Sequence, residues 1–238
     1  MKVTYKEYRE KTPLGSFFNH SIHGYISSIF SPYVSIVCMK YNLKPNTITL
    51  MMFFTGIIGG FVLMMPNVWC KLFSSVVYLL WFTFDCSDGE VARFTQTFSK
   101  GGKYLDWCSH LTTHALFIVG MWLSIIQHYN SNIIVITLVS FFFLIAEMID
   151  RNWISMDTLF GDVENNHETY QVSMSKLSFI YWQTIYMPNL IFLFPILISL
   201  DIILGLNMFY IVFMFWAVFY IFVKLRFFSK FVCKLYNS

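Results

Sequence analysis

The chain has 238 residues, of which 57% are hydrophobic, 20% are aromatic and only 12% are charged. Soluble domains carry roughly twice that share of charged residues, and a soluble fold of this size could not cover its surface with so few. The net charge of +3 is weak. This composition argues against a soluble enzyme, a nucleic-acid-binding protein and a disordered chain. We therefore expect an all-α integral membrane protein.

Six stretches of the sequence are long and apolar enough to cross a bilayer, which takes about 20 residues in a helix. The predicted spans are residues 48–65, 68–92, 106–127, 132–154, 186–204 and 208–225. Because we find neither an internal repeat nor a linker-like stretch, we expect a single domain over residues 1–238. It divides into a cytoplasmic and interfacial segment (1–45), a six-helix bundle (46–226) and a cytoplasmic tail (227–238).

The positive charges predict the orientation of these spans. All but one of the 16 Lys and Arg residues fall before the first span, in or beside every second loop, or in the tail. Only Lys71 falls on the other side. The positive-inside rule therefore places both termini in the cytoplasm. The Phe, Ile and Asn content is typical of an AT-rich genome and favours a bacterial inner membrane.

Two further segments are predicted to lie on the cytoplasmic side. Residues 14–39 are apolar but interrupted by histidines and serines, with apolar residues at helical spacing. They predict an amphipathic helix in the membrane interface, and the alternative is a packed N-terminal hairpin that touches the bundle. Residues 157–184 are more polar and indicate a cytoplasmic loop that contains a short amphipathic helix.

Carboxylates gather where the second predicted span ends and the third begins. Asp85 and Asp88 are three residues apart, and Asp106 and His110 are four apart, so each pair shares one face of a helix. A short loop makes the two helices antiparallel neighbours, so these four side chains can converge at the cytoplasmic end. Carboxylates at membrane depth are costly and are usually functional. The alternative is a buried polar network that only specifies helix packing.

Such a group of carboxylates would repel unless a cation neutralised it. Hard divalent ions with oxygen ligands, Mg²⁺ or Mn²⁺, are the natural choice. Gly89, Ala92 and Gly102 leave the nearby helix surfaces bare for a bulky ligand, and Arg93 and Lys103 are suited to bind phosphate. Metal ligands, bare helix faces and basic residues together predict a diphosphate site.

The run from Asp85 to His110 resembles the signature of the CDP-alcohol phosphotransferases (CDP-alcohol phosphatidyltransferases), D-x2-D-G-x2-A-R-x8-G-x3-D-x3-D. All of the specified positions match with the spacing intact except the last, where His110 stands in place of Asp. Pro45-Asn46-Thr47-Ile48-Thr49, before the first span, is similar to the P-N-x-x-T often found there in the family. The predicted six spans with cytoplasmic termini agree with the same resemblance.

The resemblance implies a site for a CDP-linked donor and an alcohol acceptor, with membrane lipid as a further partner. Asp85, Asp88 and Asp106, with His110 in the variant position, would hold two metal ions, Mg²⁺ or Mn²⁺. The acceptor hydroxyl would attack the phosphorus distal to the cytidine and expel CMP. A homodimer is also implied, and nucleic acid is not expected as a partner. The residues implied in nucleotide binding are Asn46, Thr49, Asp85, Asp88, Gly89, Ala92, Arg93 and Gly102.

His110 leaves three interpretations open. The favoured one makes it the general base of a variant subgroup, because an imidazole titrates near neutral pH. The second makes it a metal ligand or an acceptor-binding residue, with the base elsewhere. The third is a catalytically inactive relative, which the retention of Asp85, Asp88 and Asp106 disfavours.

Candidate residues for the acceptor are Lys103 and Arg151. Arg151 lies one helical turn after Glu147, so an internal ion pair that only satisfies both charges is the alternative. His114 continues the stripe of Asp106 and His110, and we interpret it as a packed polar residue. Gly56 and Gly60 form a GxxxG pattern, which predicts close helix packing within the bundle.

We favour an enzyme of phospholipid biosynthesis that transfers from CDP-diacylglycerol to a small polar alcohol. The reverse arrangement, in which a soluble CDP-alcohol donates its phospho-headgroup to a lipid or glycan, stays open. A different class of function would be a non-catalytic protein that binds nucleotide or metal, or a transporter. A transporter would be expected to show repeats and broken helices near the midplane. Another metal-dependent phosphotransferase with an undecaprenyl or UDP-sugar donor is the remaining alternative.

Overall fold

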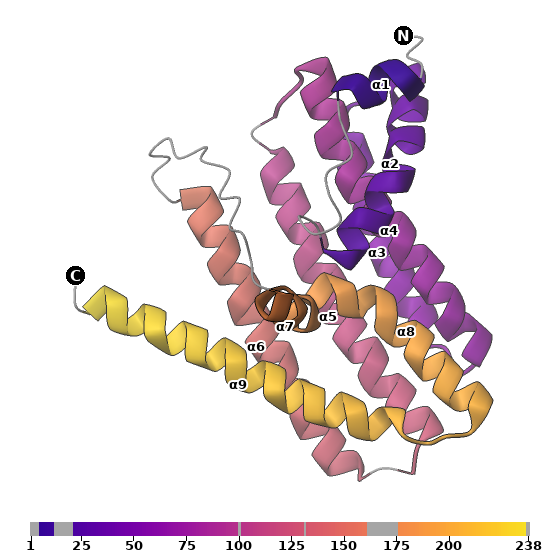
Figure 1. Cartoon of the computed structure of the whole chain (residues 1–238), viewed down its shortest axis with the longest axis vertical. Coiled ribbons are helices and arrows are strands. Elements are labelled where there is room, and N and C mark those ends of the chain that lie inside the picture. The colour runs from indigo at the N-terminus through magenta and orange to yellow at the C-terminus, as the bar shows by residue number, and fades with distance from the viewer. Residues whose placement is uncertain (1–4, 12–20, 100, 131, 161–175, 237–238) are drawn as a thin grey trace.

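The computed structural model describes residues 5–11, 21–99, 101–130, 132–160 and 176–236. These residues form helices joined by short turns, with no strand among them, so the predicted all-α class is confirmed (Figure 1). The helices are α1 (Tyr5–Lys11), α2 (Ile22–Lys40), α3 (Pro45–Met64), α4 (Val68–Thr95), α5 (Gly102–His128), α6 (Ile133–Phe160), α7 (Lys176–Ile185), α8 (Met187–Leu204) and α9 (Phe209–Tyr236).

Seven of the described helices are long and apolar enough to span a membrane, one more than the sequence predicts. The helices α3, α4, α5, α6, α8 and α9 match the predicted spans. The additional candidate is α2, which we expected to lie in the interface. The short helix expected within residues 157–184 corresponds to α7, and residues 161–175 of that loop lie outside the described part.

The centre of the molecule is a close packing of α3 against α4 and α5. A Cβ at Gly56 would lie 1.9 Å from Oγ1 of Thr113 on α5, and one at Gly60 would lie 2.6 Å from Cβ of Leu116. Both contacts are shorter than side chains tolerate, so only glycine allows the helices to approach this closely. The prediction of close packing at the GxxxG pattern is confirmed, and the packing fixes α5 beside α4.

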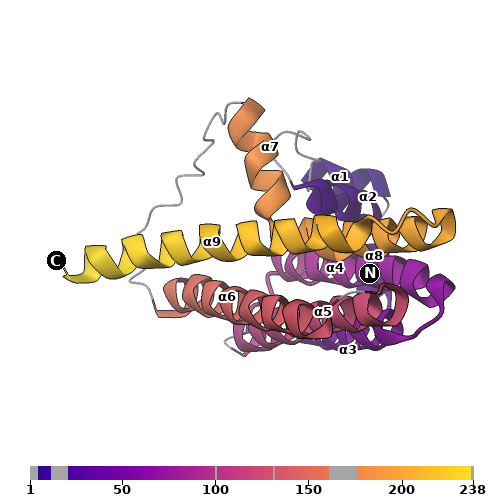
Figure 2. The same cartoon turned by 90° about the horizontal axis from the view of Figure 1, so that it is seen from below.

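The helices α6, α8 and α9 complete the bundle. An aromatic core joins them, in which the ring of Phe143 on α6 lies 5.1 Å from Tyr220 and the ring of Phe194 on α8 lies 5.2 Å from Trp216. Toward its C-terminal end α9 extends beyond the other helices of the bundle (Figure 1, Figure 2). The aromatic pairs bury large apolar areas in the bundle and hold the C-terminal helices against the centre.

The helices α1 and α2, here called the N-terminal hairpin, pack against α4. The carboxylate of Glu90 on α4 is buried and accepts hydrogen bonds from the hydroxyls of Tyr8 (2.6 Å), Ser31 (2.7 Å) and Ser35 (2.9 Å). Burial and the bond to Glu90 raise the pKa of Tyr8 well above its ordinary value, so its phenol stays a donor. Residues 21–39 of the segment expected in the interface therefore belong to α2, which packs on α4, and residues 14–20 lie outside the described part.

Lys71, the one lysine expected on the outer side, is fully buried at the start of α4. Its ammonium group donates to the carbonyl oxygens of Leu63 and Met65, at 3.4 and 2.8 Å, and to side chains of Ser124 and Gln127 on α5. The group satisfies carbonyls at the end of α3 that have no partner within that helix. Lys71 therefore acts in helix capping and is not a surface charge.

Candidate active site

The C-terminal end of α4 and the start of α5 form the candidate site. Gln96 ends α4 in the left-handed conformation (φ 53°), and residues 97–99 and 101 lie between it and α5. The turn is attached to α3, because Ser99 Oγ donates to Asn46 Oδ1 (2.8 Å) and accepts from the backbone of Gly102 (3.0 Å). This connection sets α4 and α5 side by side where their signature residues lie.

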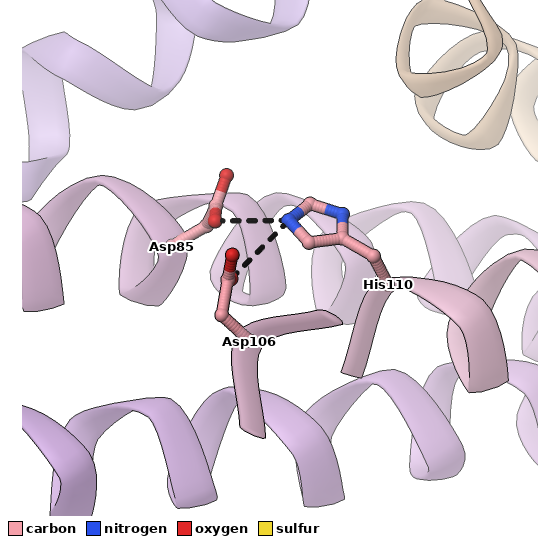
Figure 3. A group of neighbouring side chains, drawn as sticks. All are labelled: Asp85, Asp106 and His110. Carbon is pink, nitrogen blue, oxygen red and sulfur yellow. Dashed lines mark hydrogen bonds and ion pairs between the residues drawn. The ribbon is translucent and has the colours of Figure 1, made fainter. Parts of the chain in front are cut away.

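Three of the predicted metal-binding side chains converge here (Figure 3). Nε2 of His110 lies 3.2 Å from Oδ1 of Asp85 and 3.4 Å from Oδ1 of Asp106. One ligand atom from each of the three residues lies within 4.8 Å of the others. The convergence that the helical spacing predicts is therefore observed for Asp85, Asp106 and His110.

This cluster has the chemistry of a divalent-cation site. Oδ1 of Asp106 and Nδ1 of His110 are buried without a hydrogen-bond partner, and the Asp106–His110 contact lacks hydrogen-bond geometry. A buried carboxylate oxygen without a hydrogen bond is costly. Two carboxylates and an imidazole fit Mg²⁺ or Mn²⁺, because oxygen ligands suit these hard ions and imidazole nitrogen is an accepted further ligand.

Asp88, the fourth predicted ligand, lies outside this cluster. Its Oδ2 accepts a hydrogen bond from Oγ1 of Thr49 on α3 at 2.6 Å, and Thr49 is buried. The bond directs Asp88 toward the side of α4 that faces α3. Its role as a metal ligand stays a prediction, as does the second metal ion.

The other residues predicted to bind nucleotide surround the same ends of α3, α4 and α5. A Cβ at Gly102 would lie 3.0 Å from Asn46 Oδ1, and one at Gly89 would lie 3.1 Å from Nη1 of Arg93. The guanidinium of Arg93 therefore covers the bare surface at Gly89, and Ala92 lies partly exposed one turn after Asp88. Asn46 and Thr49 form the side of the site next to α3, here called the α3 side.

A family model described as CDP-alcohol phosphatidyltransferase matches residues 42–221, about three quarters of the chain. The chain belongs to the CDP-alcohol phosphatidyltransferase family. The curated proteins contain no match to it. Members of this family transfer phosphoryl-alcohol groups from a CDP-alcohol to an alcohol and depend on a divalent metal, so membership implies a membrane transferase. The match covers both halves of the site and every helix from α3 to α8.

The indole ring of Trp81 packs against the cluster of Asp85, Asp106 and His110. Trp81 is fully buried one turn before Asp85, donates from Nε1 to Ser109 Oγ (3.2 Å), and meets the ring of His110 edge-on at 5.0 Å. It limits the movement of the imidazole. Nothing in the sequence pattern distinguishes Trp81 from the other apolar residues of the span, so it was not predicted as part of the site.

A second buried network lies beside the cluster. Glu147 on α6 is fully buried and takes hydrogen bonds from Tyr220 on α9, from His114 Nδ1 (2.5 Å) and from Arg151 Nε (3.3 Å). The ring of His114 lies 5.9 Å from that of His110. The predicted Glu147–Arg151 pair is confirmed and His114 is buried as expected, whereas the part played by Tyr220 was missed. Lys103 is exposed in the first turn of α5, and its predicted role stays a prediction, as does that of Arg151.

Proposed function

We propose that this chain is a metal-dependent phosphatidyltransferase that transfers the phosphatidyl group of CDP-diacylglycerol to a small polar alcohol and releases CMP. The observation that carries the proposal is the cluster of Asp85, Asp106 and His110 within 4.8 Å, inside a family match and at one end of a membrane bundle. A lipid donor fits a site that begins where the spanning helices end, because its diphosphate reaches the cluster while its acyl chains stay in the bilayer.

The α3 side of the site is proposed to hold the nucleotide. Asp88 and Thr49 are linked by a 2.6 Å hydrogen bond, and Asn46 is fixed by Ser99 (2.8 Å), so both parts are ordered before the donor binds. The positive charge of Arg93 beside Gly89 suits the diphosphate. Ordering of these groups in advance lowers the entropic cost of positioning the donor.

His110 is proposed as the general base, acting at Nε2, while the carboxylates of Asp85 and Asp106 would hold the divalent cation. Nε2 is the ring nitrogen that faces these carboxylates, and Nδ1 is buried on the other side of the ring. The carboxylates stabilise the positive charge that forms when Nε2 takes the acceptor's proton. As the acceptor oxygen bonds to the distal phosphorus, the bond from that phosphorus to the CMP oxygen breaks. A bound divalent cation would neutralise the phosphate charge during this transfer.

We also propose that the chain is a single domain, forms a homodimer and has its site and both termini in the cytoplasm, in a bacterial inner membrane. The arrangement of Lys and Arg supports this orientation. The exception, Lys71, is enclosed by carbonyl and side-chain oxygens, so the outer face gains no exposed cation from it.

The experiment that tests the donor uses the purified protein in lipid nanodiscs with Mn²⁺ and pooled glycerol, inositol, serine and glycerol 3-phosphate. CDP-diacylglycerol is offered in one reaction and CDP-choline, with diacylglycerol, in the other. CMP release from CDP-diacylglycerol that requires the pool supports the proposal. Release from CDP-choline alone would contradict it and reverse the parts of lipid and headgroup.

A further inference from the structure

A histidine from outside the family match reaches the site. His23 lies in the first turn of α2, whereas the match begins at residue 42. Its ring packs at 4.4 Å on Phe82, which contacts Trp81 at 4.6 Å, and Trp81 in turn contacts His110. The His23 imidazole is 8% exposed and lies within electrostatic range of Asp85 and His110. The N-terminal hairpin therefore contributes a polar side chain beside the cluster.

The hydrogen bonds of His23 define which ring nitrogen can take a ligand. Asn189 directs its side-chain NH₂ at two acceptors of Gln183, the backbone O (3.0 Å) and Oε1 (2.6 Å), so its Oδ1 faces His23. That oxygen lies 3.1 Å from both the backbone N and Nδ1 of His23. Nδ1 also lies 2.8 Å from Ser21 Oγ, a hydroxyl that can donate or accept. Because the amide oxygen of Asn189 can only accept, we assign the proton to Nδ1. Nε2 is then an acceptor, and among the described residues its hydrogen-bond contact is the 3.5 Å one to Ser21 Oγ.

A tyrosine hydroxyl complements this acceptor. Tyr186 lies at the junction of α7 and α8, and its ring is 5.4 Å from that of His23. It is also within electrostatic range of Arg151 and Asp85. A tyrosine hydroxyl can donate a hydrogen bond. A ring with an acceptor nitrogen and a ring with a donor hydroxyl thus pack against each other near the cluster.

These two residues lie across α4 from Asn46 and Thr49, two of the predicted nucleotide residues. The helix α3, with Asn46 and Thr49, packs on one side of α4, and α2 packs on the other (Figure 2). Phosphoryl transfer places the attacking and leaving oxygens roughly in line on opposite sides of the phosphorus. If CMP leaves toward the α3 side, the attacking alcohol must approach from the side of α2 and α8.

We propose that His23 and Tyr186 bind the acceptor alcohol through a polar group other than the attacking hydroxyl, which donates to His23 Nε2 and accepts from the Tyr186 hydroxyl. This inference rests on the proposed function and assigns the acceptor side of its site. It makes the N-terminal hairpin, held to α4 by Glu90, a part of the site and not only a membrane anchor.

The test is the kinetics of CMP release by the full chain in nanodiscs. The variants are His23→Gln and Tyr186→Phe, and the matched controls are His128→Gln, at the outer end of α5, and Tyr33→Phe, exposed on α2. Each member of the pool of glycerol, inositol, serine and glycerol 3-phosphate is varied in turn. Loss of one hydrogen bond predicts a rise of about tenfold in the KM for the acceptor.

The KM for CDP-diacylglycerol and the half-saturating Mn²⁺ concentration should stay unchanged in both variants, because their residues lie away from the α3 side. The controls should match the wild type throughout. An unchanged acceptor KM in active variants, or an equal rise in both substrate KM values, would overturn the proposal. Absence of CMP release from the wild type with either donor would instead contradict the proposed function, and the acceptor assignment would fall with it.

Discussion

Replacement of His110 by Asp would restore the carboxylate that the family signature has at this position. Two unit charges 4 Å apart interact by about 1 kcal/mol in water and about 4 kcal/mol at an effective dielectric constant of 20. The His110 side chain is 18% exposed, so we expect an interaction energy between these two values. Without metal the new carboxylate is repelled by both Asp85 and Asp106, so the variant should lose about 2 kcal/mol of unfolding free energy at the lower limit.

With a divalent ion the new charge is attracted twice as strongly as it would be by a single positive charge. Desolvation of the new carboxylate offsets part of this gain. We expect the net effect to lower the half-saturating Mn²⁺ concentration at least about tenfold, which is about 1.4 kcal/mol. At saturating Mn²⁺ this difference adds to the unfolding free energy of the variant, so its thermal stability should respond to the metal more than that of the wild type.

The assay combines CMP release against free Mn²⁺ with thermal unfolding with and without Mn²⁺. His128→Asp is the control, since His128 ends α5 at the opposite end of the helix. An unchanged Mn²⁺ response in His110→Asp would refute the placement of this side chain at a metal site. A folded His110→Asp variant that binds Mn²⁺ more tightly but releases no CMP would show that His110 has a task a carboxylate cannot perform.

Two further predictions concern the packing that supports the site. Gly56→Ala would place a Cβ 1.9 Å from Thr113 Oγ1, so it should lower the unfolding free energy by about 1–3 kcal/mol. The control Gly101→Ala adds a Cβ in open space and should leave the unfolding free energy unchanged. Equal melting temperatures of the two variants would contradict the prediction. Glu90→Ala removes the acceptor of three hydroxyls and should cost about 1–3 kcal/mol for each one left unsatisfied. In limited proteolysis, the N-terminal hairpin of Glu90→Ala should be cut faster than that of the control Glu10→Ala. Equal rates of cleavage in the two variants would contradict the role of Glu90.

The helices and the cluster were largely predictable from the sequence. Apolar windows of sufficient length define the six expected spans, because a bilayer requires them. Asp85, Asp106 and His110 were predictable as neighbours, since helical spacing and a short turn leave few alternatives. The seventh candidate span was missed because serines such as Ser31 and Ser35 reduce the hydropathy of α2. Their hydroxyls meet a buried carboxylate, and hydropathy does not distinguish such a partner from water.

Contacts between distant helices were not predictable. Tyr220 approaches Glu147 only because α9 packs on α6, and the sequence contains no spacing that relates the two residues. The same holds for His23, whose place near Asp85 depends on Asn189 at the start of α8. Asp88 was predicted as a metal ligand from its spacing, but its hydrogen bond to Thr49 on another helix could not be predicted from that spacing.

The most direct measurement is CMP release from CDP-diacylglycerol by the purified protein in nanodiscs, with Mn²⁺ and the pooled alcohols, for the wild type, Asp106→Asn and Glu10→Gln. The account predicts CMP release that requires both metal and alcohol in the wild type and in Glu10→Gln, and none above background in Asp106→Asn. Equal CMP release by Asp106→Asn, or release that continues after the metal is chelated, would contradict the claim that this cluster carries the transfer.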